Sequence, residues 1–321
     1  MNRHFKRSVR CMVWVLIART VPDLATGPFR PCPRRSLGWC GSSSTAKRTA
    51  LRRCGSWRCS SRPARRWFRD MKLTKIDDYQ CWFLSLGQVS VLIDPWLTPE
   101  MRIAGGLFTR VHQAANPIPS LPERPDYLIV SAHFGDHLHP PSLGGYREVP
   151  TFSTKRGAAK LAKLGFRQVH TLRAGDTRCL SNNVSLQIVA PGFPYASSSL
   201  GLLFHEQTSN GVRRVYLETH VTDERELARL PKPVHALVST AESVRLFGIQ
   251  LSMDEKRAAR ATLLLGASRF IATGVAPSAS TGVLAALLSI RSTPGALQAE
   301  LVKSGAVAKA HWPQPGETIE I

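Results

Sequence analysis

The stretch DYLIVSAHFGDHLHPPSL, Asp126–Leu143, is the most informative part of the chain. Its first half contains the continuous apolar run Tyr127–Val130, which predicts a short buried strand. The strand leads directly into a loop with three histidines and one aspartate within seven residues, namely His133, Asp136, His137 and His139. Such a cluster after a strand indicates metal binding or acid–base chemistry.

Strand-like runs recur on both sides of this loop. The runs 81–87 and 89–96 are separated by Gly87 and Gln88, which predicts a hairpin. Further strands are predicted at 150–154, 168–176, 184–192, 200–207, 213–220, 235–240 and 269–274. Helices are predicted at 155–165, 223–231, 252–268, 281–290 and 294–305, with Ser252 and Glu255 as a capping box. This order predicts an α+β domain from residue 71 to 321, built as a four-layer α/β/β/α sandwich.

Residues 99–125 are rich in glycine and proline and are therefore predicted to be a loop. A loop of this length is typical of an active-site lid.

Charge separates residues 1–70 from the rest of the chain. Of the formal net charge of +21, +15 lies in the first 70 residues, which are rich in arginine and serine. This composition predicts a disordered leader that resembles an organelle transit peptide. The apolar run 11–18 after a basic start resembles the two-part leaders of plastids with extra membranes, so a plastid is favoured over a mitochondrion. The alternative is that translation starts at Met71, which would leave the protein in the cytoplasm.

The domain itself carries a net charge of only +6, so neither a nucleic acid nor a membrane is expected as its partner. Five of the seven cysteines lie in the leader, which argues against a disulfide framework in the domain. A small molecule is the expected substrate.

Several stretches resemble the metallo-β-lactamase superfamily, in the branch of the ascorbate-phosphate lactonases and their plant and cyanobacterial relatives with altered metal motifs. The stretches that carry the resemblance are MKLTKIDDYQCWFLSLGQVSVLIDPWL, DYLIVSAHFGDHLHPPSL, RRVYLETH, SMDEKRAARATLLLGASRFIATG and WPQPGETIEI. The resemblance implies a metal-dependent hydrolase in which histidines and aspartates of an HxHxDH loop bind zinc.

The match to that motif is partial. Alignment of the Asp-His pair places the first two motif histidines on Ala132 and Phe134, which cannot bind a metal. The third histidine is expected at 191–193, which reads Pro-Gly-Phe, and the last one at Gly274. His220 stands where the family has an aspartate that bridges two metals. The resemblance therefore implies that one of the two zinc sites is lost.

The remaining site would hold one ion, Zn²⁺ or else Fe²⁺ or Mn²⁺, at Asp136, His137 and His220. His133 and His139 are further candidate ligands. Besides His139, Glu218 is a candidate fourth ligand or supporting residue.

Three interpretations of the site follow. The first is a divergent hydrolase that cleaves an ester, lactone or phosphoester through this single metal, with Asp136 and His137 as catalytic residues. The second is a hydrolase without a metal, in which His137 is the general base and Asp136 orients it. The alternative is a non-catalytic protein that binds a small molecule or a protein in the former active-site pocket, with Asp136 and the histidines in structural roles. The serines at 197–199 are a polar loop that a substrate could contact.

Overall fold

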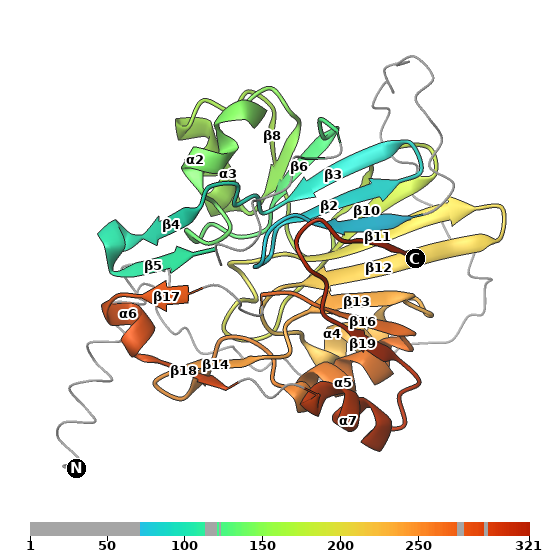
Figure 1. Cartoon of the computed structure of the whole chain (residues 1–321). Coiled ribbons are helices and arrows are strands. Elements are labelled where there is room, and N and C mark those ends of the chain that lie inside the picture. Colours follow the sequence, from blue (N-terminus) through green and yellow to red (C-terminus); the bar gives the residue numbers. More distant parts are fainter. Residues whose placement is uncertain (1–70, 113–120, 122, 275–278, 292–294) are drawn as a thin grey trace, which may run out of the picture. The chain divides into compact units, whose positions relative to one another are not determined.

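Two large β-sheets packed face to face form the centre of the domain (Figure 1). The computed structural model describes residues 71–112, 121, 123–274, 279–291 and 295–321. Within these residues each large sheet has seven strands. The first sheet has the order β20 (Thr318–Glu320), β1 (Lys72–Lys75), β2 (Trp82–Leu86), β3 (Val89–Ile93), β6 (Tyr127–Val130), β7 (Thr151–Ser153) and β8 (Val169–Thr171). The second has the order β19 (Lys309–His311), β16 (Arg269–Ala272), β13 (Ala236–Ser239), β12 (Gly211–Glu218), β11 (Gly201–Thr208), β10 (Val184–Val189) and β9 (Thr177–Cys179).

Alternating side chains explain why the two sheets stack. In β2, Trp82 and Leu84 point into the core between the sheets, while Phe83 points to the opposite face. In β12, Val215 enters the same core and Tyr216 points away from it. Both faces of these strands are buried, so they read as continuous apolar runs in the sequence.

Helices cover the two outer faces. On the first sheet, α2 (Pro140–Leu143) and α3 (Lys155–Lys163) contribute Leu143 and Leu161 to a core with Phe83 and Leu128. On the second sheet, α4 (Glu224–Arg229), α5 (Glu255–Leu265) and α7 (Ala296–Lys303) bury their apolar sides against Tyr216 and its neighbours. The predicted α+β fold is confirmed, and its four layers agree with these three cores.

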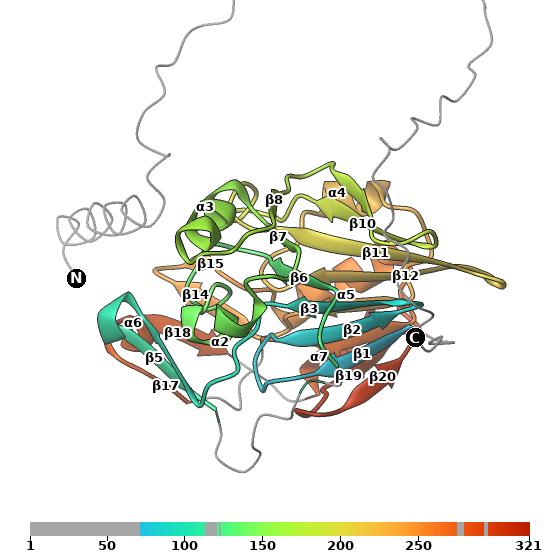
Figure 2. The same cartoon turned by 90° about the horizontal axis from the view of Figure 1, so that it is seen from above.

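Two small sheets lie to one side of the large ones (Figure 2). One consists of β4 (Glu100–Ile103), β5 (Phe108–Val111) and β17 (Ala279–Thr281), next to α6 (Val283–Ala286). The other consists of β14 (Ser243–Leu246), β15 (Ile249–Gln250) and β18 (Leu288–Arg291). The first of them packs against the histidine loop, since a Cβ on Gly135 would lie 3.0 Å from the side chain of Ile103.

The parallel strands bring the candidate residues together. In the first sheet β3 and β6 are parallel neighbours, and the chain leaves them through Asp94 and Ser131. In the second sheet β12 and β13 are parallel, and the chain leaves β12 toward His220. The carboxyl ends of parallel strands meet at one edge of a sheet, where α/β proteins commonly bind ligands.

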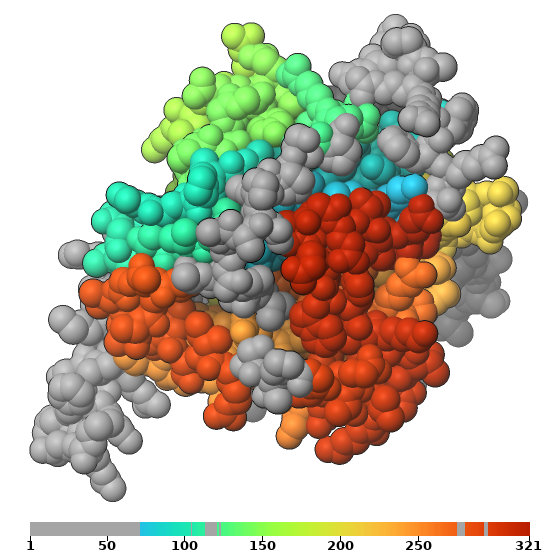
Figure 3. Space-filling view, in the orientation of Figure 1, coloured from blue at the N-terminus to red at the C-terminus, as the bar shows by residue number. Residues whose placement is uncertain are grey.

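The last strand of the chain closes the edge beside the first. Strand β20 pairs antiparallel with β1, and Thr74 lies opposite Thr318. Figure 3 shows the red C-terminal residues directly against the blue start of the domain. The backbone N–H of Ile321 donates to the carbonyl of Met71 at 2.9 Å.

Three local predictions were wrong. Residues 99–125 contain the hairpin β4–β5, because the β-branched and aromatic residues on either side of Gly105 and Gly106 pair as strands. Residues 281–290 form only the short α6 before β18, which pairs with β14. Helix α5 is capped by Asp254, which accepts from the N–H of Arg257 at 3.0 Å. Ser252 instead accepts from the N–H of Val244 at 2.9 Å.

The predicted leader, residues 1–70, lies outside the described residues. Among the helices of the described part, none is long and apolar enough to cross a membrane.

The core between the sheets should dominate stability. Phe204 of β11 is fully buried there, whereas Val307 is 90% exposed. We expect Phe204→Ala to lower the free energy of unfolding by about 3–5 kcal/mol because it leaves a cavity. Val307→Ala should change it by less than about 0.5 kcal/mol. Urea denaturation of both variants measures the difference, and equal effects would contradict the assigned core.

Candidate functional site

A buried carboxylate, Asp94, organises the start of the histidine loop. Its side chain accepts the N–H of Ser131 at 2.7 Å and the hydroxyl of the same serine at 2.5 Å. His137 Nδ1 lies 2.9 Å from Asp94 Oδ2. Because a carboxylate can only accept, the imidazole carries a proton on Nδ1 and turns Nε2 toward the interior of the site. The residue that orients His137 is thus Asp94, and not Asp136 as the sequence suggested.

His220 has a comparable environment. Glu218 Oε1 lies 3.3 Å from His220 Nδ1 and also accepts the backbone N–H of His220 at 3.0 Å. The hydroxyl of Ser199 lies 3.2 Å from the same Nδ1. Glu218 is therefore a supporting residue that directs Nδ1–H of His220 outward and its Nε2 inward.

The two imidazoles face each other across the gap between the sheets. Their Nε2 atoms are 3.1 Å apart, and the ring centroids of His137 and His220 are 4.7 Å apart in a stacked arrangement. With both Nδ1 atoms protonated, each Nε2 carries a lone pair, and two such atoms 3.1 Å apart repel each other unless a positive charge lies between them.

The surrounding charge is strongly negative. Asp94 and Glu218 are completely buried, and Glu218 Oε2 has no hydrogen-bond partner among the described residues. Burial disfavours the imidazolium form of His137, but the carboxylates of Asp94, Asp136 and Glu218 outweigh it and raise its pKa to about 9. The site therefore attracts a cation.

Asp136 lies at the open side of this pair. Its Oδ2 is 3.8 Å from His137 Nε2 and accepts the hydroxyl of Tyr79 at 3.3 Å. Gln80 donates to the backbone carbonyl of Asp136 at 2.6 Å. The Asp136 side chain is 26% exposed, whereas that of His137 is not exposed at all.

Two aromatic rings close over the histidines. Tyr195 lies against His220 with ring centroids 3.9 Å apart, and Phe134 approaches His220 at 6.1 Å and Tyr195 at 6.0 Å. Burial, followed by the nearby Asp136 carboxylate, raises the pKa of Tyr195. Phe134 thus occupies apolar volume at the position where the family motif has a histidine.

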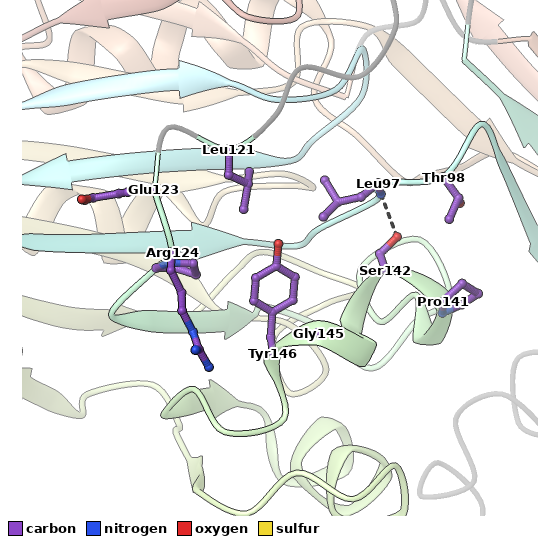
Figure 4. A pocket seen from close by; sticks show the side chains of 10 residues that line it. Leu97, Thr98, Leu121, Glu123, Arg124, Pro141, Ser142, Gly145 and Tyr146 are labelled. Atoms are coloured by element: carbon purple, nitrogen blue, oxygen red, sulfur yellow. Dashed lines mark hydrogen bonds between the residues drawn. The ribbon is translucent and has the colours of Figure 1, made fainter.

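The other two candidate ligands are not brought to the pair. His139 contacts the hydroxyl of Ser142 through Nδ1 at 2.8 Å, and this serine accepts the N–H of Leu97 at 2.7 Å. Figure 4 shows Ser142 and Leu97 on the wall of a separate pocket of about 710 Å³, which Tyr146 also lines. The ring of His133 packs on Phe134 with centroids 4.4 Å apart.

The positions aligned with the other family ligands hold small residues in close contacts. Ala132 forms a β-bridge with Ser199. A Cβ on Gly192 would lie 2.7 Å from the carbonyl oxygen of Thr222, so no side chain fits there. Gly274 has φ 68° and donates its N–H to the carbonyl of Tyr79 at 2.7 Å. A histidine at 192 or 274 would therefore require a different backbone.

Sequence reasoning missed three residues of the site, namely Asp94, Tyr79 and Tyr195. The sequence does mark Asp94, because this residue directly follows an apolar run that predicts a strand and precedes Pro95. Its φ of 46° is unusual for a residue other than glycine and marks a constrained position. The sequence does not mark Tyr79 and Tyr195, because only the tertiary structure brings them to the histidines.

Comparison with known proteins identifies the fold. No protein-family model and no curated protein matches the sequence. Solved structures do match. Igni18, a metallo hydrolase from the archaeon Ignicoccus hospitalis, superposes with a TM-score of 0.55 at 17% identity over 78% of this chain and 98% of its own. The isothiocyanate hydrolase from Delia radicum gut bacteria has a TM-score of 0.56 at 17% identity, with the same coverage of 78% and 98%.

The metallo-β-lactamase fold protein YhfI from Bacillus subtilis matches 78% of this chain and 99% of its own, with a TM-score of 0.54 at 13% identity. The domain has the metallo-β-lactamase fold. In this fold the two large sheets are the central layers, and the loops after β3, β6 and β12 carry the candidate residues. At these identities the likeness establishes the fold alone.

The site around His137 and His220 fits a cation in its charge and in the type of its donor atoms. His137 and His220 offer two carboxylate-backed nitrogens, and the orphaned Glu218 Oε2 shows that negative charge is in excess. Within the described residues, however, no three histidine, cysteine, aspartate or glutamate side chains form a ready-made metal-binding group. Asp136, the nearest third ligand, is turned toward Tyr79.

Asp94→Asn tests the orientation of His137. An asparagine amide in place of Oδ2 donates, so Nδ1 of His137 must accept and the proton moves to Nε2. We expect the reversed tautomer and a loss of about 1.5–3 kcal/mol of stability, typical for a hydrogen bond to a charged group. Nitrogen-15 NMR reports the tautomer when it is recorded well above pH 9, where the imidazole of His137 is neutral.

Asp126→Asn is the matched control, because Asp126 Oδ2 likewise accepts the N–H and the hydroxyl of a serine, Ser90, each at 3.1 Å. It should leave the His137 tautomer unchanged. If His137 kept its proton on Nδ1 in Asp94→Asn, the assigned role of Asp94 would be wrong.

Proposed function

We propose that this protein is a hydrolase that cleaves an ester, lactone or phosphoester of a small molecule with a single metal ion. The ion is held by His137, His220 and Asp136, and is Zn²⁺ or else Fe²⁺ or Mn²⁺. The proposal includes a place near the ascorbate-phosphate lactonases, with one of the two metal sites of that branch lost.

The observation that carries the proposal is the pair of facing imidazoles. Each has its Nδ1 beside a fully buried carboxylate, Asp94 or Glu218, and the two Nε2 atoms lie 3.1 Å apart. Metal-binding histidines typically donate their second N–H to a carboxylate in this way. The names of the structural neighbours Igni18 and isothiocyanate hydrolase are consistent with hydrolysis.

The proposed role of each site residue follows from how exposed its side chain is. His137 and His220 are buried and hold their nitrogens in place, while Phe134 and Tyr195 limit the access of water. When bound, the ion polarises the carbonyl or phosphoryl oxygen and makes a nearby water more acidic. Asp136, the exposed member of the set, accepts the proton that the attacking water loses and returns it to the oxygen of the departing group. The Tyr79 hydroxyl orients the carboxylate of Asp136.

A second candidate function is binding without catalysis. It is favoured by the complete burial of the His137 side chain and by the absence of a three-residue metal group within the described part of the chain. In that case the histidine pair carries a proton instead of a metal ion, and the former active site holds a small molecule or a protein partner.

Elemental analysis of the purified full-length protein separates the two functions. We expect about one metal ion per chain in the wild type and loss of the ion in His137→Ala and His220→Ala, because each removes one nitrogen ligand. A chelator should lower the unfolding free energy of the wild type by about 2.7 kcal/mol if free metal had been at 100 times its Kd.

His205→Ala is the control, since His205 lies on β11 and contacts Gln187 at 3.3 Å, with no contact to the site. It should keep its metal. The loaded wild type should then hydrolyse 4-nitrophenyl acetate, a simple lactone or bis(4-nitrophenyl) phosphate. A metal-free wild type whose stability does not respond to the chelator would overturn the hydrolase proposal and support the binding function.

A further inference from the structure

Strand β5 carries a buried arginine whose donors are not used. Arg110 is only 8% exposed, and its Nε and Nη2 atoms are buried without a hydrogen-bond partner among the described residues. Burial of a guanidinium without an acceptor is costly, so such groups are normally paired. The described residues therefore offer no acceptor to Nε and Nη2 of Arg110.

Arg110 contacts Tyr79, which in turn contacts the proposed catalytic residue Asp136. Its Cζ lies 3.8 Å from the centre of the Tyr79 ring, and the hydroxyl of Tyr79 donates to Asp136. A cation–π contact uses the face of the guanidinium, so Tyr79 does not engage the N–H groups in its plane, and Nε and Nη2 are buried. Tyr79 thus contacts Arg110 with its ring face and Asp136 with its hydroxyl.

No carboxylate of the described residues forms an ion pair with Arg110. Asp77 accepts the backbone N–H groups of Tyr79 and Cys81 at 3.0 and 2.7 Å. Asp78 pairs with His112, which is stacked on Trp96 with centroids 3.7 Å apart. Asp78 is therefore engaged by His112, whereas Asp77 uses Oδ1 for these N–H groups and its Oδ2 has no hydrogen-bond partner among the described residues.

The framework holds Arg110 and Asp136 in a defined relation. Arg110 pairs with Met101 of β4 and with Ser280 of β17, in the middle of the small sheet. The same sheet contacts the histidine loop where Ile103 meets Gly135, the residue before Asp136. Figure 1 shows β4, β5 and β17 together beside the large sheets.

We propose that Arg110 binds an acidic group of the substrate, a phosphate or a carboxylate, while the bond to be cleaved lies at His137 and at Asp136, the carboxylate that accepts the Tyr79 hydroxyl. A guanidinium matches both acidic groups because two of its N–H groups can bind two oxygens in parallel. The inference rests on the proposed hydrolase function and narrows its substrates to anionic esters, lactones and phosphoesters.

The test measures anion binding without hydrolysis. Full-length protein, freed of metal with a chelator, is titrated with inorganic phosphate, acetate or chloride at constant ionic strength, and Tm is recorded. We expect a saturable rise of Tm with phosphate, with acetate or with both. The anion that acts identifies the acidic group, and chloride corrects for general charge screening.

Variants assign the effect to Arg110. Arg110→Gln should weaken anion binding about 10- to 100-fold, as expected for the loss of charged hydrogen bonds. Arg110→Lys should keep part of the affinity as a point charge. Arg102→Gln is the matched control, since Arg102 lies exposed on β4 of the same hairpin and pairs with Glu100. It should bind the anion as the wild type does.

Two outcomes would overturn the inference. One is a wild type that responds to neither phosphate nor acetate by Tm or by titration calorimetry, which requires no variant to fold. The other is an equal response of the wild type, Arg110→Gln and Arg110→Lys. Because the protein is metal-free throughout, this result is independent of metal content and of hydrolysis, which test the proposed function itself.

Discussion

The carboxylate of Asp94 joins the framework of the domain to its candidate site. It lies where β3 ends, in a left-handed backbone conformation, and its N–H donates to the carbonyl of Ile129 in the parallel neighbour β6. Through its side chain it holds Ser131, the first residue after β6, and the ring of His137. One residue therefore couples the register of two core strands to the direction of an imidazole.

The same kind of contact occurs twice at the site. Asp94 and Glu218 each lie beside the Nδ1 atom of one imidazole, and the Nε2 atoms of His137 and His220 are 3.1 Å apart. Phe134 and Tyr195 add apolar surface beside His220, which strengthens electrostatic interactions inside the site.

The fold was largely predictable because its strands are apolar on both faces and end at clear turn residues. The run VSVLI lies between Gly87 and Pro95, and YLIV lies between Pro125 and the histidine loop. Apolar runs this short with such turn residues beside them favour buried strands. The β4–β5 hairpin was missed because short strands around a pair of glycines resemble a loop. The 281–290 segment was misread because its alanines and leucines favour a helix locally, whereas pairing with β14 favours a strand.

The site was predictable only in part, because several of its residues meet only through the tertiary structure. Asp136, His137 and His220 follow strands and could be aligned with a motif, so their approximate places were accessible from the sequence. The partner of His137 is 43 residues away, and Tyr195 and Arg110 come from separate segments. Motif spacing describes one loop at a time, but the environment of a charge depends on every segment that packs around it.

The pairing of β20 with β1 has a consequence for synthesis of the protein. The hydroxyls of Thr74 and Thr318 meet at 2.9 Å, although 244 residues separate them. As the ribosome extends the chain, β1 emerges first among the described strands, yet one of its edges stays unpaired until β20 has left the exit tunnel. Contacts of such long sequence separation slow folding and expose strand edges in the meantime. The first sheet can therefore be completed only after β20 has been synthesised, and that edge of β1 stays open until then.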